Sequence, residues 1–362
     1  MSVSSGERTI ADEEPLETFA IVVMGPTGTG KSTFINLLTE SGLLVGNELE
    51  SCTDSVHFSS PFTVDGKQVI LMDTPGFDDT KTTDSDVLKM IAASLSLCRG
   101  NHLKLAGVIY MHRIVDNRMG GISSRNFRMF RQLCGDSSLS KVVIVTTMWD
   151  QIDMTLGEAR EAELMTKTIF FEPAVTRGAH MARHDNTHAS AASIIRSVLT
   201  RCHEQKPLQI QEELENGVDI SATKAGQELN QDIKERSSRY KDDLRVVMEE
   251  MQDAIRLRDE ESRRELAQER ERLEMMIRRL EQESANLASG YAEILGRLEA
   301  RVQSSTRSVS LQALSTATPP VVAAAETESN AILEGKIAAA FPVFGFWGRV
   351  AVMLAPFSLS WK

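Results

Sequence analysis

An unbroken G-x-x-x-x-G-K-S motif, from Gly25 to Ser32, directly follows an apolar run at residues 19–24 and constrains this chain more than any other feature. Glycines in such a motif let successive backbone N–H groups curl around phosphates, and the helix expected next adds its positive N-terminal end. Lys31 would reach the β- and γ-phosphates, and the Ser32 hydroxyl would ligate Mg²⁺. The motif predicts a nucleoside triphosphate site with these phosphate-binding residues: Gly25, Thr27, Gly28, Thr29, Gly30, Lys31, Ser32 and Thr33.

The first part of the chain has the rhythm of an α/β protein. Apolar runs at residues 19–24, 69–73, 106–111 and 142–147 alternate with amphipathic stretches, as strands and helices do in a doubly wound sheet. Each run is nearly continuous in apolar residues, which is typical of strands covered on both faces. Asp65-Gly66 favours a hairpin turn, which places an antiparallel strand at the sheet edge. We predict a doubly wound, mostly parallel sheet in a domain at residues 18–204, after a disordered lead-in at 1–17.

A second motif, Asp73-Thr-Pro-Gly76, stands at the end of the second predicted core strand. An acidic residue at this place holds Mg²⁺ through water, and the Gly76 amide can sense the γ-phosphate. Thr53, in the polar connection before the hairpin, is placed where a switch threonine would close on the ion. We therefore expect Mg²⁺ as cofactor, with Ser32, Thr53 and Asp73 as its ligands.

The base is expected to lie against Thr147-Met-Trp-Asp150, which follows the fourth predicted strand. The Asp150 carboxylate can accept hydrogen bonds from N1–H and the exocyclic amine of guanine, a pattern that adenine lacks. The usual form of this motif has a lysine where Met148 stands, although a thioether can also pack on the ring. A last strand is expected within residues 178–186, with Asn186 completing the base site. An ATPase that uses the same P-loop stays open as an alternative.

Composition narrows the partners and the compartment. The formal charge of −11 argues against a nucleic-acid partner, because nucleic-acid-binding surfaces need an excess of Lys and Arg. The four cysteines show no C-x-x-C spacing, and the polar N-terminus lacks the features of a signal peptide. We expect reduced thiols and a cytoplasmic protein.

The C-terminal part changes to a helical composition. Leu266, Leu273, Leu280, Leu287 and Ile294 repeat every seven residues, which predicts a long helical coiled coil at 205–303, interrupted near 256–263. Pairing with a second chain and folding back as a hairpin both stay open. A Ser/Thr/Ala/Pro-rich linker at 304–333 leads to a hydrophobic tail at 334–362. The tail has the length of a membrane span, but two prolines and Arg349 count against one, so membrane association and packing on the protein both stay open.

The P-loop, the switch threonine, D-x-P-G and T-x-x-D, in this order, resemble the translation-factor-related class of GTPases. Within it the chain looks like the septin and immunity-associated (GIMAP-like) group with its chloroplast import-receptor relatives. Residues 107–119 are especially similar to fungal G domain-containing proteins. The resemblance covers about residues 19–202 and implies a G domain that binds GTP and GDP and hydrolyses GTP.

The resemblance also has consequences for catalysis. Phe77 stands where Ras-like enzymes have a glutamine that orients the attacking water, so slow intrinsic hydrolysis is expected. Relatives without this glutamine often pair their G domains across the nucleotide, and some supply an arginine in trans; Arg113 is our first candidate and Arg118 the second. The expected catalytic set is Lys31, Thr53, Gly76 and Arg113. We expect a slow GTPase that acts as an assembly switch through dimers or oligomers, and the alternative is a non-catalytic GTP-binding scaffold.

Overall fold

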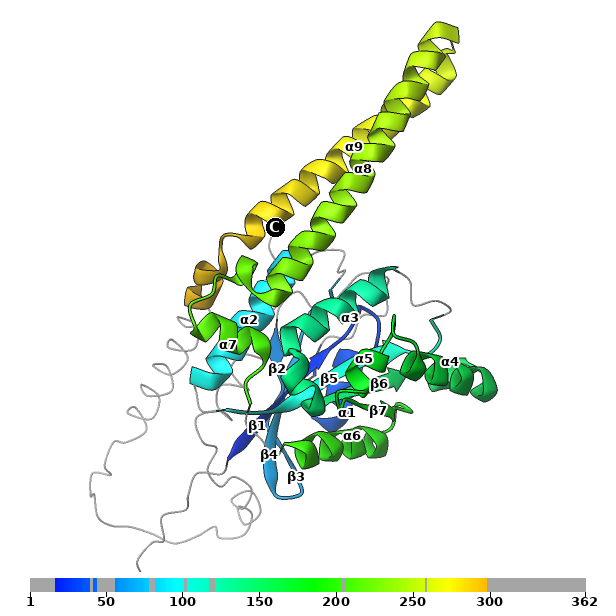
Figure 1. Ribbon diagram of the computed structural model, residues 1–362. Coiled ribbons are helices and arrows are strands. Elements are labelled where there is room, and N and C mark those ends of the chain that lie inside the picture. Colours follow the sequence, from blue (N-terminus) through cyan, green and yellow to red (C-terminus); the bar gives the residue numbers. More distant parts are fainter. Residues whose placement is uncertain are drawn as a thin grey trace, which may run out of the picture.

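The computed structural model of the protein describes residues 17–39, 42–43, 56–77, 82–100, 103–116, 121–202, 206–257 and 259–297. An α/β domain carries a pair of long helices that project from it (Figure 1). The predicted linker and hydrophobic tail lie outside the described residues, as does the lead-in up to residue 16. Among the described helices, none combines the length and the apolar character that a membrane crossing needs.

The sheet is mostly parallel, as predicted. Its order is β2-β4-β1-β5-β6-β7, and β3 also pairs with β4. The parallel strands are β1 (Thr18–Met24), β4 (Lys67–Asp73), β5 (Lys104–Arg113), β6 (Val142–Thr147) and β7 (His180–Arg183). β2 (His57–Phe58) and β3 (Phe62–Val64) run antiparallel to β4. The predicted hairpin turn joins β3 to β4, and both of its residues, Asp65 and Gly66, have positive φ.

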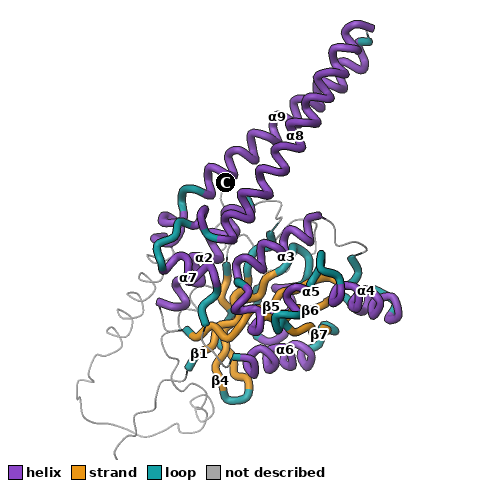
Figure 2. Tube along the Cα trace, viewed as in Figure 1, coloured by secondary structure: helices purple, strands orange, loops and turns teal. Residues whose placement is uncertain are grey.

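Helices cover both faces of the sheet (Figures 1 and 2). Odd-numbered residues of β1 pack with α1 (Lys31–Leu38) and α6 (His188–Arg201) in one core. Even-numbered residues of β1 pack with α2 (Asp84–Gly100), α3 (Gly121–Cys134) and α7 (Gln209–Glu215) in the other. Beyond β6 lie α4 (Met154–Thr166) and α5 (Glu172–Val175). The two cores explain why these strands are apolar on both sides.

The long C-terminal helix is folded into a hairpin. α8 (Lys224–Leu257) and α9 (Glu260–Leu287) run side by side in opposite directions (Figure 2), so of the two alternatives left open by the sequence the chain takes the hairpin. The break falls inside the predicted interruption, where the Asp259 side chain accepts from the backbone N–H of Glu261 and Ser262 and caps α9. The apolar seam is buried within one chain: Leu229, Ile233, Val247 and Ala254 of α8, with Leu273, Ile277, Leu280 and Leu287 of α9. This seam is therefore not available for pairing with a second copy.

The base of the hairpin is anchored to α2 and α3. The buried guanidinium of Arg125 on α3 lies 2.9 Å from an Asp84 carboxylate oxygen on α2 and 3.2 Å from one of Asp232 on α8. The Ser85 hydroxyl donates to the backbone carbonyl of Glu283 on α9, at 3.1 Å. The hairpin and the α/β domain are thus joined through polar contacts as well as through a continuous apolar core.

Candidate nucleotide-binding site

The P-loop connects the carboxyl end of β1 to the first turn of α1. Gly25, Gly28 and Gly30 all have positive φ, which glycine adopts without strain. A Cβ atom on Gly25 would lie 2.4 Å from the backbone oxygen of Met111, so β5 packs directly against the start of the loop. Gly30 precedes α1 without a side-chain cap, which leaves the helix N-terminus to be capped by a phosphate.

Two polar side chains of the loop, Thr29 and Lys31, donate hydrogen bonds to the loop's own backbone carbonyls. Lys31 is buried at the start of α1, and its Nζ donates to the carbonyl oxygens of Gly25 and Pro26 at 2.9 and 3.0 Å. The Thr27 Oγ1 is buried and has no hydrogen-bond partner among the described residues. Thr29 is buried, and Thr33 lies in the first turn of α1. The structure thus shows a loop with glycines at positive φ ahead of α1, and phosphate binding by this loop stays a prediction.

Ser32 and Asp73 come together beside the P-loop, where a metal ion would sit. The Ser32 Oγ lies 2.6 Å from Asp73 Oδ2, and Asp73 Oδ1 is buried without a hydrogen-bond partner among the described residues. Burial raises the pKa of the Asp73 carboxyl above its ordinary value, and the nearby Lys31 ammonium opposes this shift. A buried, incompletely bonded carboxylate beside a hydroxyl fits Mg²⁺, which binds hard oxygen ligands. The third predicted ligand, Thr53, lies outside the described residues.

Such an ion would take most of its ligands from phosphate oxygens and water. Within the described ranges, no three His, Cys, Asp or Glu side chains come together as a metal-binding group. This composition suits a Mg²⁺–nucleotide site, because Mg²⁺ is usually held by one or two protein oxygens plus the substrate phosphates.

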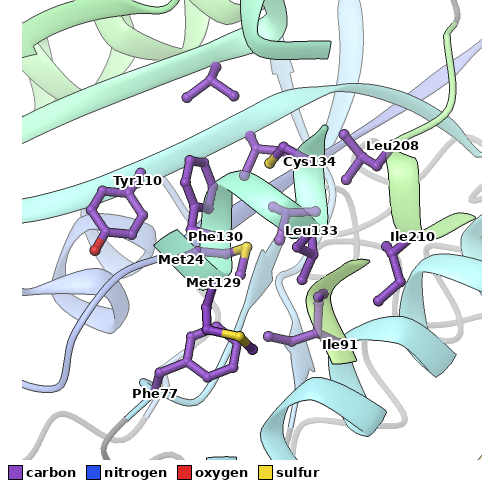
Figure 3. Packing of buried hydrophobic residues seen from close by; sticks show 14 of the residues in the cluster. Met24, Phe77, Ile91, Tyr110, Met129, Phe130, Leu133, Cys134, Leu208 and Ile210 are labelled. Atoms are coloured by element: carbon purple, nitrogen blue, oxygen red, sulfur yellow. The ribbon is translucent and has the colours of Figure 1, made fainter. Parts of the chain in front are cut away.

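The D-x-P-G segment lies against the P-loop. A Cβ atom on Gly76 would be 2.6 Å from the Thr27 backbone nitrogen, so the two segments touch at the residue predicted to sense a γ-phosphate. Phe77 then turns into the core, in the same cluster as Ile91 and Met129 (Figure 3). Its carbonyl accepts a hydrogen bond from the Asn126 side chain at 3.1 Å. The position of the water-orienting glutamine of Ras-like enzymes is therefore occupied by a buried aromatic ring.

The residues predicted to read the base follow β6 and β7, which are neighbours in the sheet. The Thr147 Oγ1 lies 3.2 Å from the carbonyl oxygen of Thr29 and ties the end of β6 to the P-loop. Met148 adopts a left-handed conformation at φ 62, and Asp150 follows in a short 3-10 helix, η2 (Trp149–Gln151). Asn186 also has positive φ, in the turn between β7 and α6. β6 and β7 are parallel, and Thr146 near the end of β6 pairs with Arg183 at the end of β7. Asp150 and Asn186 therefore both follow the same edge of the sheet, and both side chains are exposed.

Two features near the site were not predicted from the sequence. The Arg183 guanidinium stacks over the Trp149 ring, 4.3 Å from its centre, and lies 2.6 Å from a Glu161 carboxylate oxygen. Trp149 in turn donates from Nε1 to the carbonyl oxygen of Thr146 at 3.2 Å. This stack fixes the backbone that presents Asp150, and no local spacing signals it, since its members come from three separate elements.

The arrangement of these parts is similar to that of P-loop GTPase G domains. The P-loop opens α1, Asp73 at the end of β4 meets Ser32, and a T-x-x-D segment follows β6. Residues 20–146 match the family model described as 50S ribosome-binding GTPase.

Individual relatives agree over the same region. GTPase Der of Rhodopirellula baltica is 28% identical over 150 residues, which cover 40% of this chain and 30% of that protein. GTPase Der of Rickettsia rickettsii is 27% identical over 158 residues, or 43% of this chain and 33% of that protein. The chain thus spans about a third of the length of these curated relatives. Toc33 from Arabidopsis thaliana, solved with Mg²⁺ and GMPPNP, aligns with a TM-score of 0.41 and 14% identity, over 53% of this chain and 88% of that one.

Proposed function

We propose that this protein binds GTP with Mg²⁺ and hydrolyses it slowly to GDP and phosphate, as a nucleotide-dependent assembly switch. The observation that carries the proposal is the Ser32–Asp73 pair beside a complete P-loop, next to a Phe77 that is buried in the core. The P-loop and the Ser32–Asp73 pair provide phosphate and metal binding. Phe77 leaves the attacking water without its usual orienting side chain.

Catalysis would rest on position and charge. Lys31, the P-loop amides and the start of α1 oppose the negative charge on the transferring γ-phosphoryl group. Ser32, Asp73 and Thr53 would hold Mg²⁺, and the bound ion would supply positive charge opposite the phosphates. The Gly76 amide reports the γ-phosphate, and Asp150 selects guanine together with Asn186, which follows the neighbouring strand β7.

A chain of contacts connects the D-x-P-G segment to the helical hairpin through α3. Asn126 holds the Phe77 carbonyl of the D-x-P-G segment, and its neighbour Arg125 binds Asp84 at the start of α2 and Asp232 on α8. A displacement of the D-x-P-G segment after loss of the γ-phosphate would therefore act on α3, which supports the base of the hairpin. We propose that this route couples hydrolysis to the pairing of G domains into dimers or oligomers.

The test begins with nucleotide specificity. GTP and ATP affinities are measured for the wild type and for Asp150→Ala, with Glu163→Ala as a control that removes a 44% exposed carboxylate from α4. We expect the wild type to prefer GTP and Asp150→Ala to lose that preference, since a carboxylate accepts both guanine N–H groups. A variant that kept its preference would refute the role of Asp150. ATP binding as tight as GTP binding in the wild type would favour the ATPase alternative.

Phosphate release then separates an enzyme from a scaffold. Release is measured over a range of protein concentrations, together with the mass of the GDP- and GTP-loaded protein. Slow release that rises with concentration, alongside a larger mass in one nucleotide state, is the expected result. Nucleotide that co-purifies without turnover at any concentration would favour the non-catalytic scaffold.

Three expectations about location and partners stay predictions. They are a cytoplasmic location, membrane association through residues 334–362, and the absence of a nucleic-acid partner. Membrane fractionation that is unchanged when residues 334–362 are deleted would remove the role of the tail.

A further inference from the structure

The end of β5 runs along the P-loop of the same chain. Gly25 packs on the Met111 backbone, and two residues later the Arg113 guanidinium reaches Gly28, where a Cβ atom would lie 3.5 Å from its Nη1. Gly28 is an exposed residue of the loop. The arginine therefore lies beside the phosphate-binding loop of its own chain.

The Arg113 side chain is oriented but incompletely bonded. Its Nη2 lies 3.0 Å from an Asp116 carboxylate oxygen, while its Nε is buried without a hydrogen-bond partner among the described residues. The backbone on both sides is fixed, because Arg113 pairs with Thr147 in the sheet and the Ile114 N–H donates to the Thr147 carbonyl at 3.0 Å. A guanidinium has five N–H donors in a planar fork that matches phosphate oxygens. With 38% of its side chain exposed, the fork remains accessible to a ligand.

From this geometry we propose that Arg113 is a phosphate-binding residue that acts in cis, on the nucleotide held by its own P-loop. The inference rests on the proposed function, since it deepens the same site. Asp116 is then a positioning residue that holds the guanidinium against Gly28. Binding in cis needs no second copy, because the side chain is already oriented beside the loop and little further freedom is lost.

Matched variants separate phosphate binding in cis from two alternatives for Arg113, a purely structural role in its loop and a role in trans. If Arg113 only stabilised its loop through the ion pair, Arg113→Ala and Asp116→Asn would weaken nucleotide binding equally. If Arg113 binds phosphate, Asp116→Asn keeps the arginine and removes a negative charge from the neighbourhood of the phosphates. If Arg113 acted in trans, the effect of its removal would appear only where two chains pair.

The experiment measures the affinity of fluorescent GDP and GTP for the full chain with Mg²⁺, at protein concentrations where light scattering shows a monomer. We expect Arg113→Ala to weaken both affinities by roughly ten- to a hundredfold, the range for one or two charged hydrogen bonds. Asp116→Asn is expected to bind within about threefold of the wild type or more tightly, since it retains the donor. Arg245→Ala, which removes a 73% exposed arginine from α8, is the control and should not change affinity.

Each outcome decides the matter. Unchanged affinity of Arg113→Ala in the monomer overturns the proposal, and a loss confined to concentrations that allow pairing assigns the arginine to the partner chain. Equal losses in Arg113→Ala and Asp116→Asn reduce the pair to a structural role. Arg113→Lys, which keeps the charge, checks that a loss in Arg113→Ala does not come from misfolding. Absence of nucleotide binding in the wild type would instead refute the proposed function as a whole.

Discussion

Replacing Arg125 by methionine removes the cation that joins α2, α3 and α8 while leaving most of its volume. Arg125, Asp84 and Asp232 have side chains only 7%, 8% and 7% exposed, so the variant leaves two buried carboxylates without this partner. Arg236 compensates Asp232 in part from 3.6 Å, whereas Asp84 also faces the charge of Glu283, whose own pKa is raised by burial and by Asp84. Breaking a buried pair typically costs about 3–5 kcal/mol. With Arg236 retained, we expect a loss near the lower end, about 3 kcal/mol.

The assay is urea unfolding followed by helical circular dichroism, with the wild type and variants compared at equal slope. Arg128→Met is the matched control, because Arg128 also links α3 to α8 through Glu228, but its side chain is 53% exposed. An exposed pair of this kind contributes less than about 1 kcal/mol.

A triple variant separates charge from packing. Arg125→Met combined with Asp84→Asn and Asp232→Asn should recover most of the lost stability, because it removes the two carboxylates that Arg125→Met leaves uncompensated, while Glu283 and Arg236 keep each other's charge. The reasoning is refuted if Arg125→Met costs no more than Arg128→Met. It is equally refuted if the triple variant is as unstable as the single one.

Two further predictions concern the site. Gly25→Ala should abolish nucleotide binding and destabilise the fold by more than Gly217→Ala. A Cβ on Gly25 would lie 2.4 Å from the Met111 backbone oxygen, whereas one on Gly217, which also has positive φ, would have no atom within 4 Å. Equal melting temperatures of the two variants would contradict this prediction. Burial lowers the pKa of His112 to about 4, so the folded state stays neutral while the unfolded chain takes up a proton below about pH 6.5. The free energy of unfolding should therefore fall by up to about 3 kcal/mol between pH 6.5 and 4, and His112→Phe should remove that part of the slope. A His112→Phe slope equal to that of the wild type would disprove the assignment.

The sheet and the P-loop were predictable because their signals are local. A strand, a glycine-rich loop and a helix are consecutive in the chain, and Asp73 directly ends an apolar run. The heptad rows were also correct as a seam, since Leu273, Leu280 and Leu287 are buried between the two helices. Their partner was not predictable, because the same apolar row can pack against a second chain or against the preceding helix.

The residues that connect the site to the hairpin had no such signal. Arg125 meets Asp232 across 107 residues of sequence and Asp84 across 41, and none of the three belongs to a recognisable motif. The position of Arg113 also had no local signal. The resemblance suggested a role in trans, whereas the contact of Arg113 with Gly28 depends on the pairing of β5 with β1 in the sheet. Long-range ion pairs are fixed by topology, which a single sequence does not reveal.

Because α9 runs back along α8, the chain returns to the α/β domain after the helical hairpin. α8 leads the backbone outward by roughly 50 Å at 1.5 Å per residue, and α9 brings it back, so that Tyr291 lies 3.3 Å from Ser96 on α2. The last described stretch of helix, which ends at residue 297, therefore lies beside the α/β domain, whereas the tip of the hairpin, where α8 ends and α9 begins, points away from it (Figure 1).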